Sequence, residues 1–177
     1  MSFAKIYTRG VLGLHAPLIE VEVHVSQGLP SLTIVGLAEA AVRESKDRVR
    51  SAIINSGFQF PTKRLTINLA PADLPKDGSR LDLPIALGIL IASGQIPDQK
   101  ITDYELIGEL ALDGQLRAVS STLSIALACQ KAQHKLLLPT DNAHEAAQLQ
   151  QLDVYAASSL QQVCQHFLEQ QPIQVTH

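Results

Sequence analysis

The residues with the most obvious chemical potential lie in a short loop that precedes a long apolar segment. Residues 73–82 supply carboxylates, a lysine, an arginine and a hydroxyl, namely Asp73, Lys76, Asp77, Ser79, Arg80 and Asp82. The apolar run Leu83–Ser93 follows at once and predicts a buried helix. Because backbone N–H groups at the start of a helix can bind an oxyanion, the segment 76–80 is a candidate loop site. It also fits a charged connection that caps the helix, and the spacing does not decide between the two interpretations.

A second group of candidates is basic. Residues 43–64 contain six lysines and arginines but only two acidic residues, Glu44 and Asp47. On a helix, Glu44 would lie one turn from Arg48, and Arg43 one turn from Asp47. That spacing predicts a solvated face whose charges pair with one another. The alternative interpretation is a binding patch.

Other motifs that carry catalysis or binding are missing from the sequence. There is no phosphate-binding loop of the form GxxxxGKS/T or GxGxxG. The six histidines have no HxxxH or HExxH spacing, so we predict no metal site. Cys129 falls among alanines in a predicted helix, where a cysteine usually packs as a small apolar residue. Two cysteines, Cys129 and Cys164, are too few for a disulfide framework or a zinc site. We predict no cofactor and no thiol nucleophile in this chain.

The composition is typical of a folded domain with an aliphatic core. Of the 177 residues, 46% are apolar, 18% are charged and 4% are aromatic. The net charge of −3 gives no global reason to expect a protein that binds nucleic acid or a membrane surface. Its distribution is uneven, because residues 1–100 carry +2 and residues 101–177 carry −5. The longest apolar run is far shorter than the roughly 20 residues of a membrane span, and no signal-peptide pattern is present. We therefore predict a cytoplasmic chain without a membrane partner.

Hydrophobic periodicity predicts a mixed α/β arrangement in a single domain. Asp82 fits the N-cap of the apolar helix, and Ser158 with Gln161 fits a capping box for the last helix. The dipeptide Asp113-Gly114 predicts a hairpin. The predicted strands cover residues 18–26, 32–36, 65–69, 104–112, 115–119, 135–138 and 154–156. The predicted helices cover residues 38–55, 83–93, 121–133 and 158–169, with one more that starts near Asp141 or Asn142.

Three stretches of the chain resemble a family signature. They are Gly28–Gly57, then Thr66–Gly78 with the string PADLPKDG followed by Leu81–Ala86, and finally Gly108–Gly114 with the string GELALDG. The likeness runs from about residue 3 to residue 165. On these motifs the chain resembles the N-terminal domain of the magnesium-chelatase-like AAA+ ATPases, the YifB/ComM competence protein family.

The resemblance implies both a fold and a larger protein of which this domain would be a part. The fold would be similar to the Lon proteolytic domain, a ribosomal protein S5 domain 2-like fold, over residues 1–168. Residues 169–177 would be a tail that leads to an AAA+ ATPase module, where ATP and Mg²⁺ are expected. Proteins of this family assemble as hexameric, ATP-driven DNA translocases that promote branch migration in natural transformation. The implied partners are other copies of the protein, and DNA.

The Lon likeness also bears on catalysis. Lon proteases use a serine that is activated by a desolvated lysine. Their serine lies two positions after the glycine of a PKDG-like loop, and their lysine lies early in the helix that follows the third motif. The corresponding positions here are Arg80 and Leu123. Because neither side chain can act as the nucleophile or the base, the resemblance implies that the dyad is absent and that this domain is not an enzyme.

The main hypothesis is therefore a non-catalytic assembly or DNA-contact module of an ATP-dependent DNA translocase. The candidate residues for contact with DNA or a partner are Arg43, Lys46, Arg50, Lys63 and Arg64. One alternative is a residual peptidase that uses Ser79 or a serine near Ser120–Ser124. Another is a protein-interaction module of a magnesium-chelatase-like ATPase.

Overall fold

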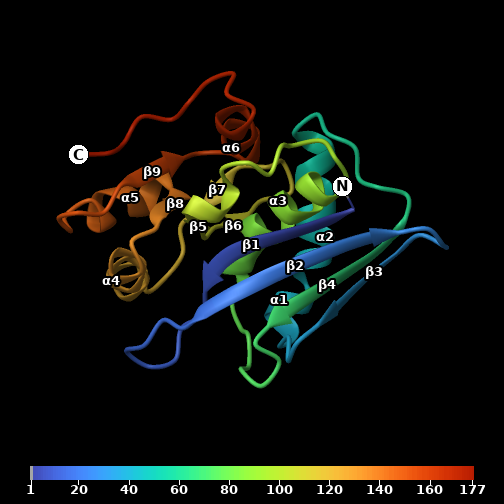
Figure 1. Ribbon diagram of the computed structural model, residues 1–177, viewed down its shortest axis with the longest axis horizontal. Coiled ribbons are helices and arrows are strands. Elements are labelled where there is room, and N and C mark those ends of the chain that lie inside the picture. The colour runs from blue at the N-terminus through green and yellow to red at the C-terminus, as the bar shows by residue number, and fades with distance from the viewer. Residues whose placement is uncertain (1) are drawn as a thin grey trace.

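A seven-stranded mixed sheet lies at the centre of the computed structural model, which describes residues 2–177 (Figure 1). The strand order is β3-β4-β2-β1-β5-β8-β9, and β6 with β7 forms a separate hairpin. The inner strands β1, β2 and β4 pair antiparallel, whereas β3, β5, β8 and β9 are added by parallel pairing. The strands are β1 Phe3–Arg9, β2 Leu18–Ser26, β3 Ser31–Val35, β4 Arg64–Ala70, β5 Tyr104–Leu106, β6 Glu109–Leu110, β7 Leu116–Arg117, β8 Lys135–Pro139 and β9 Val154–Ala157.

The alternation along β2 gives the sheet one apolar face and one polar face. Ile19, Val21 and Val23 are completely buried. His24 is exposed on the opposite face, where Glu22 accepts a hydrogen bond from the Asn68 side chain at 2.8 Å. The predicted strand over residues 18–26 is confirmed, and its apolar face carries the main hydrophobic core.

Helix α3 is buried along its whole length, between the sheet and α2 (Figure 1). A β-carbon at Gly88 would lie only 2.7 Å from Val23 Cγ2, so glycine allows the helix to approach the sheet closely. The prediction of an apolar helix between two layers is confirmed. The helices are α1 Ala40–Arg43, α2 Ser45–Asn55, α3 Asp82–Ala92, α4 Thr122–Ala132, α5 Thr140–Ala146 and α6 Leu160–Phe167, with short 3-10 helices η1 Ser79–Leu81 and η2 Ile101–Asp103.

A second hydrophobic core lies between α4, α5 and the parallel strands of the C-terminal half. Cys129 is fully buried within it, and burial raises the pKa of its thiol. The segment 169–177 is not a free tail throughout, because residues near its end return to the sheet. The Thr176 N–H donates to the Val154 carbonyl oxygen at 2.8 Å, and Val175 forms an isolated bridge with Tyr155. This segment therefore covers part of the β9 edge.

Three predicted elements differ from the observed ones. The predicted helix over residues 38–55 is broken at Glu44 into α1 and α2. The predicted strand over residues 104–112 is two strands, of which β5 joins the main sheet and β6 pairs with β7 around the Asp113-Gly114 turn. The predicted capping box is displaced by one residue, because Ser159 is the N-cap of α6 and its hydroxyl accepts from the Gln162 N–H at 3.1 Å. Long-range strand pairing and local capping decide these boundaries, and hydrophobic periodicity predicts neither of them.

Candidate functional site

Lys76, from the candidate loop site, is almost entirely buried. Only 1% of its surface is exposed, and its Nζ donates to the carbonyl oxygens of Gly36, at 2.8 Å, and of Pro71. Its own backbone exchanges hydrogen bonds with Leu37 and Glu39, each at 2.9 Å. Burial lowers the pKa of Lys76. The side chain holds two loops together, which is a structural role.

Ser79 and Arg80 lie in η1, directly before α3. The Ser79 hydroxyl donates to the Glu109 carboxylate, and Arg80 Nη1 donates to the Asp77 carbonyl oxygen at 3.0 Å. Burial lowers the pKa of Arg80. Its Nε is buried without a hydrogen-bond partner among residues 2–177. The Lys76 ammonium, the Ser79 hydroxyl and Arg80 Nη1 are each engaged by neighbouring protein groups.

The two positions that the resemblance to Lon proteases relates to the dyad are Arg80 and Leu123. Arg80 is turned toward its own loop, and Leu123 lies in the first turn of α4, where 45% of its surface is exposed. Within residues 2–177, no hydrogen bond joins a serine of the loop to a lysine, because Ser79 faces Glu109 and Lys76 faces carbonyl oxygens.

Asp82 is not the N-cap that the sequence predicts for α3. Leu81 occupies the cap position, and Asp82 lies fully buried in the first turn. Its carboxylate accepts hydrogen bonds from Ser45 Oγ at 2.5 Å, from Arg48 Nε at 2.7 Å and from the Leu110 N–H at 3.0 Å. Burial raises the pKa of Asp82, although the hydrogen bonds from Arg48 and Ser45 oppose this rise. The carboxylate therefore joins α2, α3 and β6.

Arg48 has a different main partner from the one that its spacing predicts. The predicted ion pair with Glu44 is present but loose, with 3.9 Å between Nη1 and Oε2 and a largely exposed carboxylate. The main partner is Asp82, whose carboxylate accepts hydrogen bonds from both Nε and Nη2 of Arg48. The predicted pair between Arg43 and Asp47 is not among the ion pairs of residues 2–177, so that part of the self-paired face is wrong.

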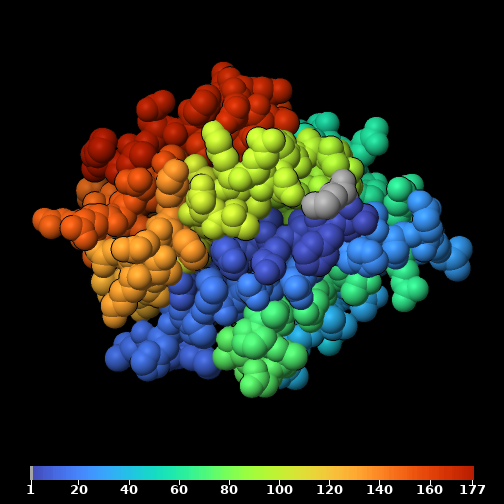
Figure 2. Space-filling view, viewed as in Figure 1, coloured from blue at the N-terminus to red at the C-terminus, as the bar shows by residue number. Residues whose placement is uncertain are grey.

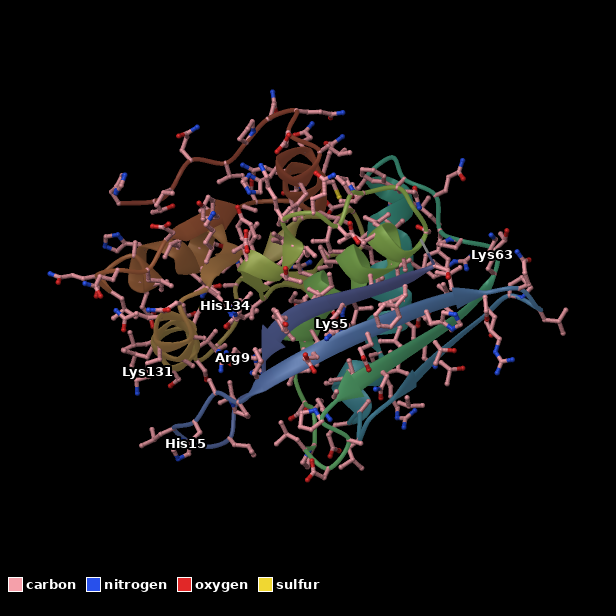
Figure 3. The ribbon with its side chains drawn as sticks, in the orientation of Figure 1. Lys5, Arg9, His15, Lys63, Lys131 and His134 are labelled. Atoms are coloured by element: carbon pink, nitrogen blue, oxygen red, sulfur yellow. The ribbon has the colours of Figure 1, made fainter. Side chains whose placement is uncertain are left out.

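A second buried charge cluster surrounds Glu105, and sequence reasoning missed it. Arg9 donates from Nε and Nη2 to the two carboxylate oxygens at 2.7 and 2.8 Å. His134 Nδ1 lies 2.7 Å from Oε2, and its ring stacks on Tyr7 with centroids 5.4 Å apart. Figure 3 shows Arg9 and His134 on neighbouring elements at the end of β1. Because these groups satisfy one another, the cluster is a structural link between β1, β5 and the residues before β8.

The five basic contact candidates lie on α1, on α2, in the loop before β4 and at the start of β4. Arg43 lies on α1, where its Nε donates to the Ala38 carbonyl oxygen at 3.0 Å. Lys46 lies one turn before Arg50 on α2 and is partly buried. Only Arg50 and Lys63 line the same hollow. The fold thus brings together two residues that the chain separates by a helix end and a loop.

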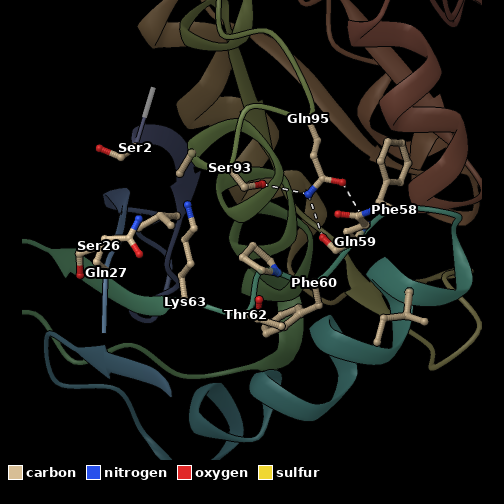
Figure 4. A pocket seen from close by; sticks show the side chains of 14 residues that line it. Ser2, Ser26, Gln27, Phe58, Gln59, Phe60, Thr62, Lys63, Ser93 and Gln95 are labelled. Carbon is tan, nitrogen blue, oxygen red and sulfur yellow. Dashed lines mark hydrogen bonds between the residues drawn. The ribbon is translucent and has the colours of Figure 1, made fainter. Parts of the chain in front are cut away.

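Two adjoining hollows flank the loop before β4, and Figure 4 shows the residues that line the larger one. The larger, of about 900 Å³, lies between this loop, the end of β2 and the end of α3. The smaller, of about 240 Å³, lies between the same loop, α2 and the start of β3. Both are lined by Phe60, Pro61, Thr62 and Lys63, and we call them together the Lys63 groove. Arg64, the fifth basic candidate, follows directly and its stem lies beside the turn at Gly28.

Residues 21–142 match the family described as subunit ChlI of Mg-chelatase. The chain is 52% identical over 169 residues to the uncharacterized protein YifB of Salmonella typhimurium and of Escherichia coli, which is 96% of this chain and 33% of each relative. It is 48% identical over 165 residues to competence protein ComM of Haemophilus influenzae, which is 93% of this chain and 32% of that relative. The chain belongs to the magnesium-chelatase-like YifB/ComM family.

As a member of the YifB/ComM family, the chain spans about one third of the length of these curated relatives. The mixed α/β single domain that the sequence predicts is confirmed. Within residues 2–177, no group of three or more His, Cys, Asp or Glu side chains is placed to hold a metal ion. No helix formed by these residues combines the length and the apolar character needed to traverse a bilayer.

Proposed function

We propose that this chain is a non-catalytic assembly and DNA-contact module of an ATP-dependent hexameric DNA translocase that promotes branch migration in natural transformation and recombination. The observation that carries the proposal is the 48% identity to competence protein ComM along 93% of this chain. Because the chain spans about a third of that relative, we place the AAA+ ATPase, with its ATP and Mg²⁺, outside the chain and after residues 169–177.

The geometry of the loop site supports the non-catalytic part of the proposal. A serine nucleophile needs a base within hydrogen-bond reach that can take its proton. The dyad positions hold Arg80 and Leu123, and the buried amino group of Lys76 is directed at carbonyl oxygens. These side chains fit a domain whose contribution is binding rather than bond cleavage.

An apolar surface supports the assembly part. Leu12 and Leu14, on the loop between β1 and β2, are 49% and 91% exposed, and Leu123 and Leu127 on α4 are 45% and 41% exposed. A hollow of about 530 Å³ lies between this loop and α4, which are side by side in Figure 2. Grouped exposed leucines of this kind mark protein–protein contact surfaces. We assign this surface to contact with another protomer of the hexamer.

Deletion of the module from the complete protein tests the proposed function. We expect a variant that lacks residues 1–168 to retain ATP hydrolysis but to show branch migration on a three-strand DNA substrate that is at least about tenfold slower, a difference of about 1.4 kcal/mol or more. Sedimentation in the presence of ATP would report hexamer formation for both proteins. A truncated protein that assembles and migrates branches like the complete protein would contradict the proposal.

A residual serine peptidase is the second candidate, and one contact favours it. The Ser79 hydroxyl donates to the Glu109 carboxylate, which is a group able to accept its proton. On the main proposal, incubation of the chain with unfolded casein is expected to yield no fragments. Cleavage that disappears in a Ser79→Ala variant would establish the peptidase and remove the non-catalytic part of the proposal.

A further inference from the structure

We propose that the Lys63 groove binds single-stranded DNA, with phosphates on Lys63 and Arg50 and a base stacked at Phe60. This inference rests on the proposed function and deepens it, because it assigns the DNA contact to one surface and one form of DNA. Three properties of the groove carry the inference: the sign of its charges, its aromatic lining and the fixed position of its walls.

The charges that line the groove are of one sign. Among residues 2–177, Arg50 and Lys63 are the only charged residues of the lining, and no aspartate or glutamate belongs to either hollow. The remaining lining side chains are apolar, hydroxyl or amide groups. On a chain whose net charge is −3, a concave surface with only positive charges attracts a polyanion locally. Charge complementarity therefore favours a phosphate backbone over an acid-poor peptide.

Aromatic rings distinguish the groove from a simple basic surface. Phe60 lines both hollows and Phe58 lines the larger one, and both rings are only partly buried against the core. The Arg50 guanidinium lies 5.2 Å from the centroid of the Phe60 ring. Aromatic rings next to cations are the combination that unpaired bases and their phosphates occupy in proteins that bind single strands.

The walls of the groove are held in place before any ligand binds. Gln95 Nε2 donates to the Gln59 carbonyl oxygen at 2.8 Å, and the Gln59 N–H donates back to Gln95 Oε1 at 3.0 Å. Gln95 Nε2 also donates to Ser93 Oγ at 3.0 Å. Figure 4 shows these bonds between the end of α3 and the loop that carries Phe60. A preformed site avoids the cost of ordering a loop when the ligand binds.

The shape of the groove favours a single strand over a duplex. Its rings lie within hollows that are bounded by the β2 end, α2 and the α3 end. The bases of a duplex are already stacked on one another, so their faces cannot reach a ring in a hollow without unpairing. A duplex would contact only the rim of the groove, through its phosphates.

Fluorescence anisotropy of a labelled oligo(dT) strand, titrated with the 177-residue chain at several salt concentrations, tests the inference. We expect Lys63→Glu to weaken binding at least about tenfold and to reduce the slope of log K against log salt by about 0.7, because one fewer phosphate is neutralised. The matched control is Lys131→Glu, which makes the same charge change at an exposed lysine on the opposite end of the molecule (Figure 3). The control is expected to bind like the unmodified chain.

A second pair of variants separates stacking from charge. Phe60→Ala is expected to weaken oligo(dT) binding about tenfold, whereas Phe60→Tyr keeps a ring and is expected to retain it. Binding to heparin, a polyanion without bases, is expected to change little in either variant. Circular dichroism of both variants confirms that they are folded before they are compared.

Several results would overturn the inference. They are equal losses of affinity for Lys63→Glu and Lys131→Glu, unchanged affinity for Phe60→Ala, stronger binding of a duplex than of oligo(dT), or an unstructured peptide that competes for the groove. These results would contradict the groove as a DNA site but not the proposed function, which the deletion experiment tests separately. The deletion of residues 1–168 can still slow branch migration, through lost assembly contacts, when the groove itself does not bind DNA.

Discussion

Replacement of Glu105 by alanine is expected to lower the free energy of unfolding by about 3 to 5 kcal/mol, the usual effect of removing one partner of a buried ion pair. Glu105 is completely buried and Arg9 is only 8% exposed. The alanine variant would leave the Arg9 guanidinium without its two carboxylate bonds. For a domain of this size the expected fall in melting temperature is about 6 to 20 °C.

Thermal melts followed by circular dichroism would measure this fall, and a double variant provides the control. Arg9→Met with Glu105→Leu removes both charges and fills similar volumes. Because an apolar pair commonly replaces a buried ion pair without a fall in stability, the double variant is expected to melt well above Glu105→Ala. If the single variant melts within about 2 °C of the unmodified chain, the cluster does not hold β1 to β5.

The sequence alone predicts those elements whose pattern is local. Alternation along residues 18–26 predicts β2, because each buried valine has an exposed or half-exposed neighbour. The uninterrupted apolar run predicts α3, because a helix without a polar face must lie between layers. What periodicity does not predict is the parallel partner of a strand, such as β1 beside β5, since the pairing of Tyr7 with Glu105 depends on the whole chain path.

The candidate site was predictable in composition but not in arrangement. The five basic residues are recognisable from their type, yet the sequence places Arg43 and Arg50 on one helix and Lys63 outside it. The break at Glu44 separates Arg43 from this group, and the path of the loop before β4 brings Lys63 to Arg50. The Lys63 groove also depends on Phe60, whose ring has no signal in the charge pattern. Its placement beside Arg50, ten positions earlier, is a tertiary contact.

Asp82→Ala is expected to cost about 3 to 5 kcal/mol of unfolding free energy, for the same reason as at Glu105. Asp82 is fully buried and accepts from Ser45, Arg48 and the Leu110 N–H. An N-cap aspartate, the role that the sequence predicts, would cost only about 0.5 to 2 kcal/mol when replaced by alanine. Urea unfolding of the variant therefore distinguishes the two roles by the size of the decrease.

Asp82→Asn sharpens the distinction, because asparagine is as good an N-cap as aspartate. If the carboxylate serves as the counter-charge of Arg48, the asparagine variant is expected to be less stable by more than about 2 kcal/mol, since the part-buried guanidinium keeps its charge without a partner. Arg48→Met in the same background is expected to recover part of that decrease.

Because burial raises the pKa of Asp82 above its value in the unfolded chain, the folded form binds a proton on Asp82 more readily than the unfolded form does. The stability that this protonation adds is fully present below the unfolded pKa and is lost as pH rises through the folded pKa. The ion pair with Arg48 forms only above the folded pKa, so Asp82→Asn is compared with the unmodified chain at those pH values. A neutral effect of Asp82→Asn at every pH would show that the ion pair adds nothing to the fold.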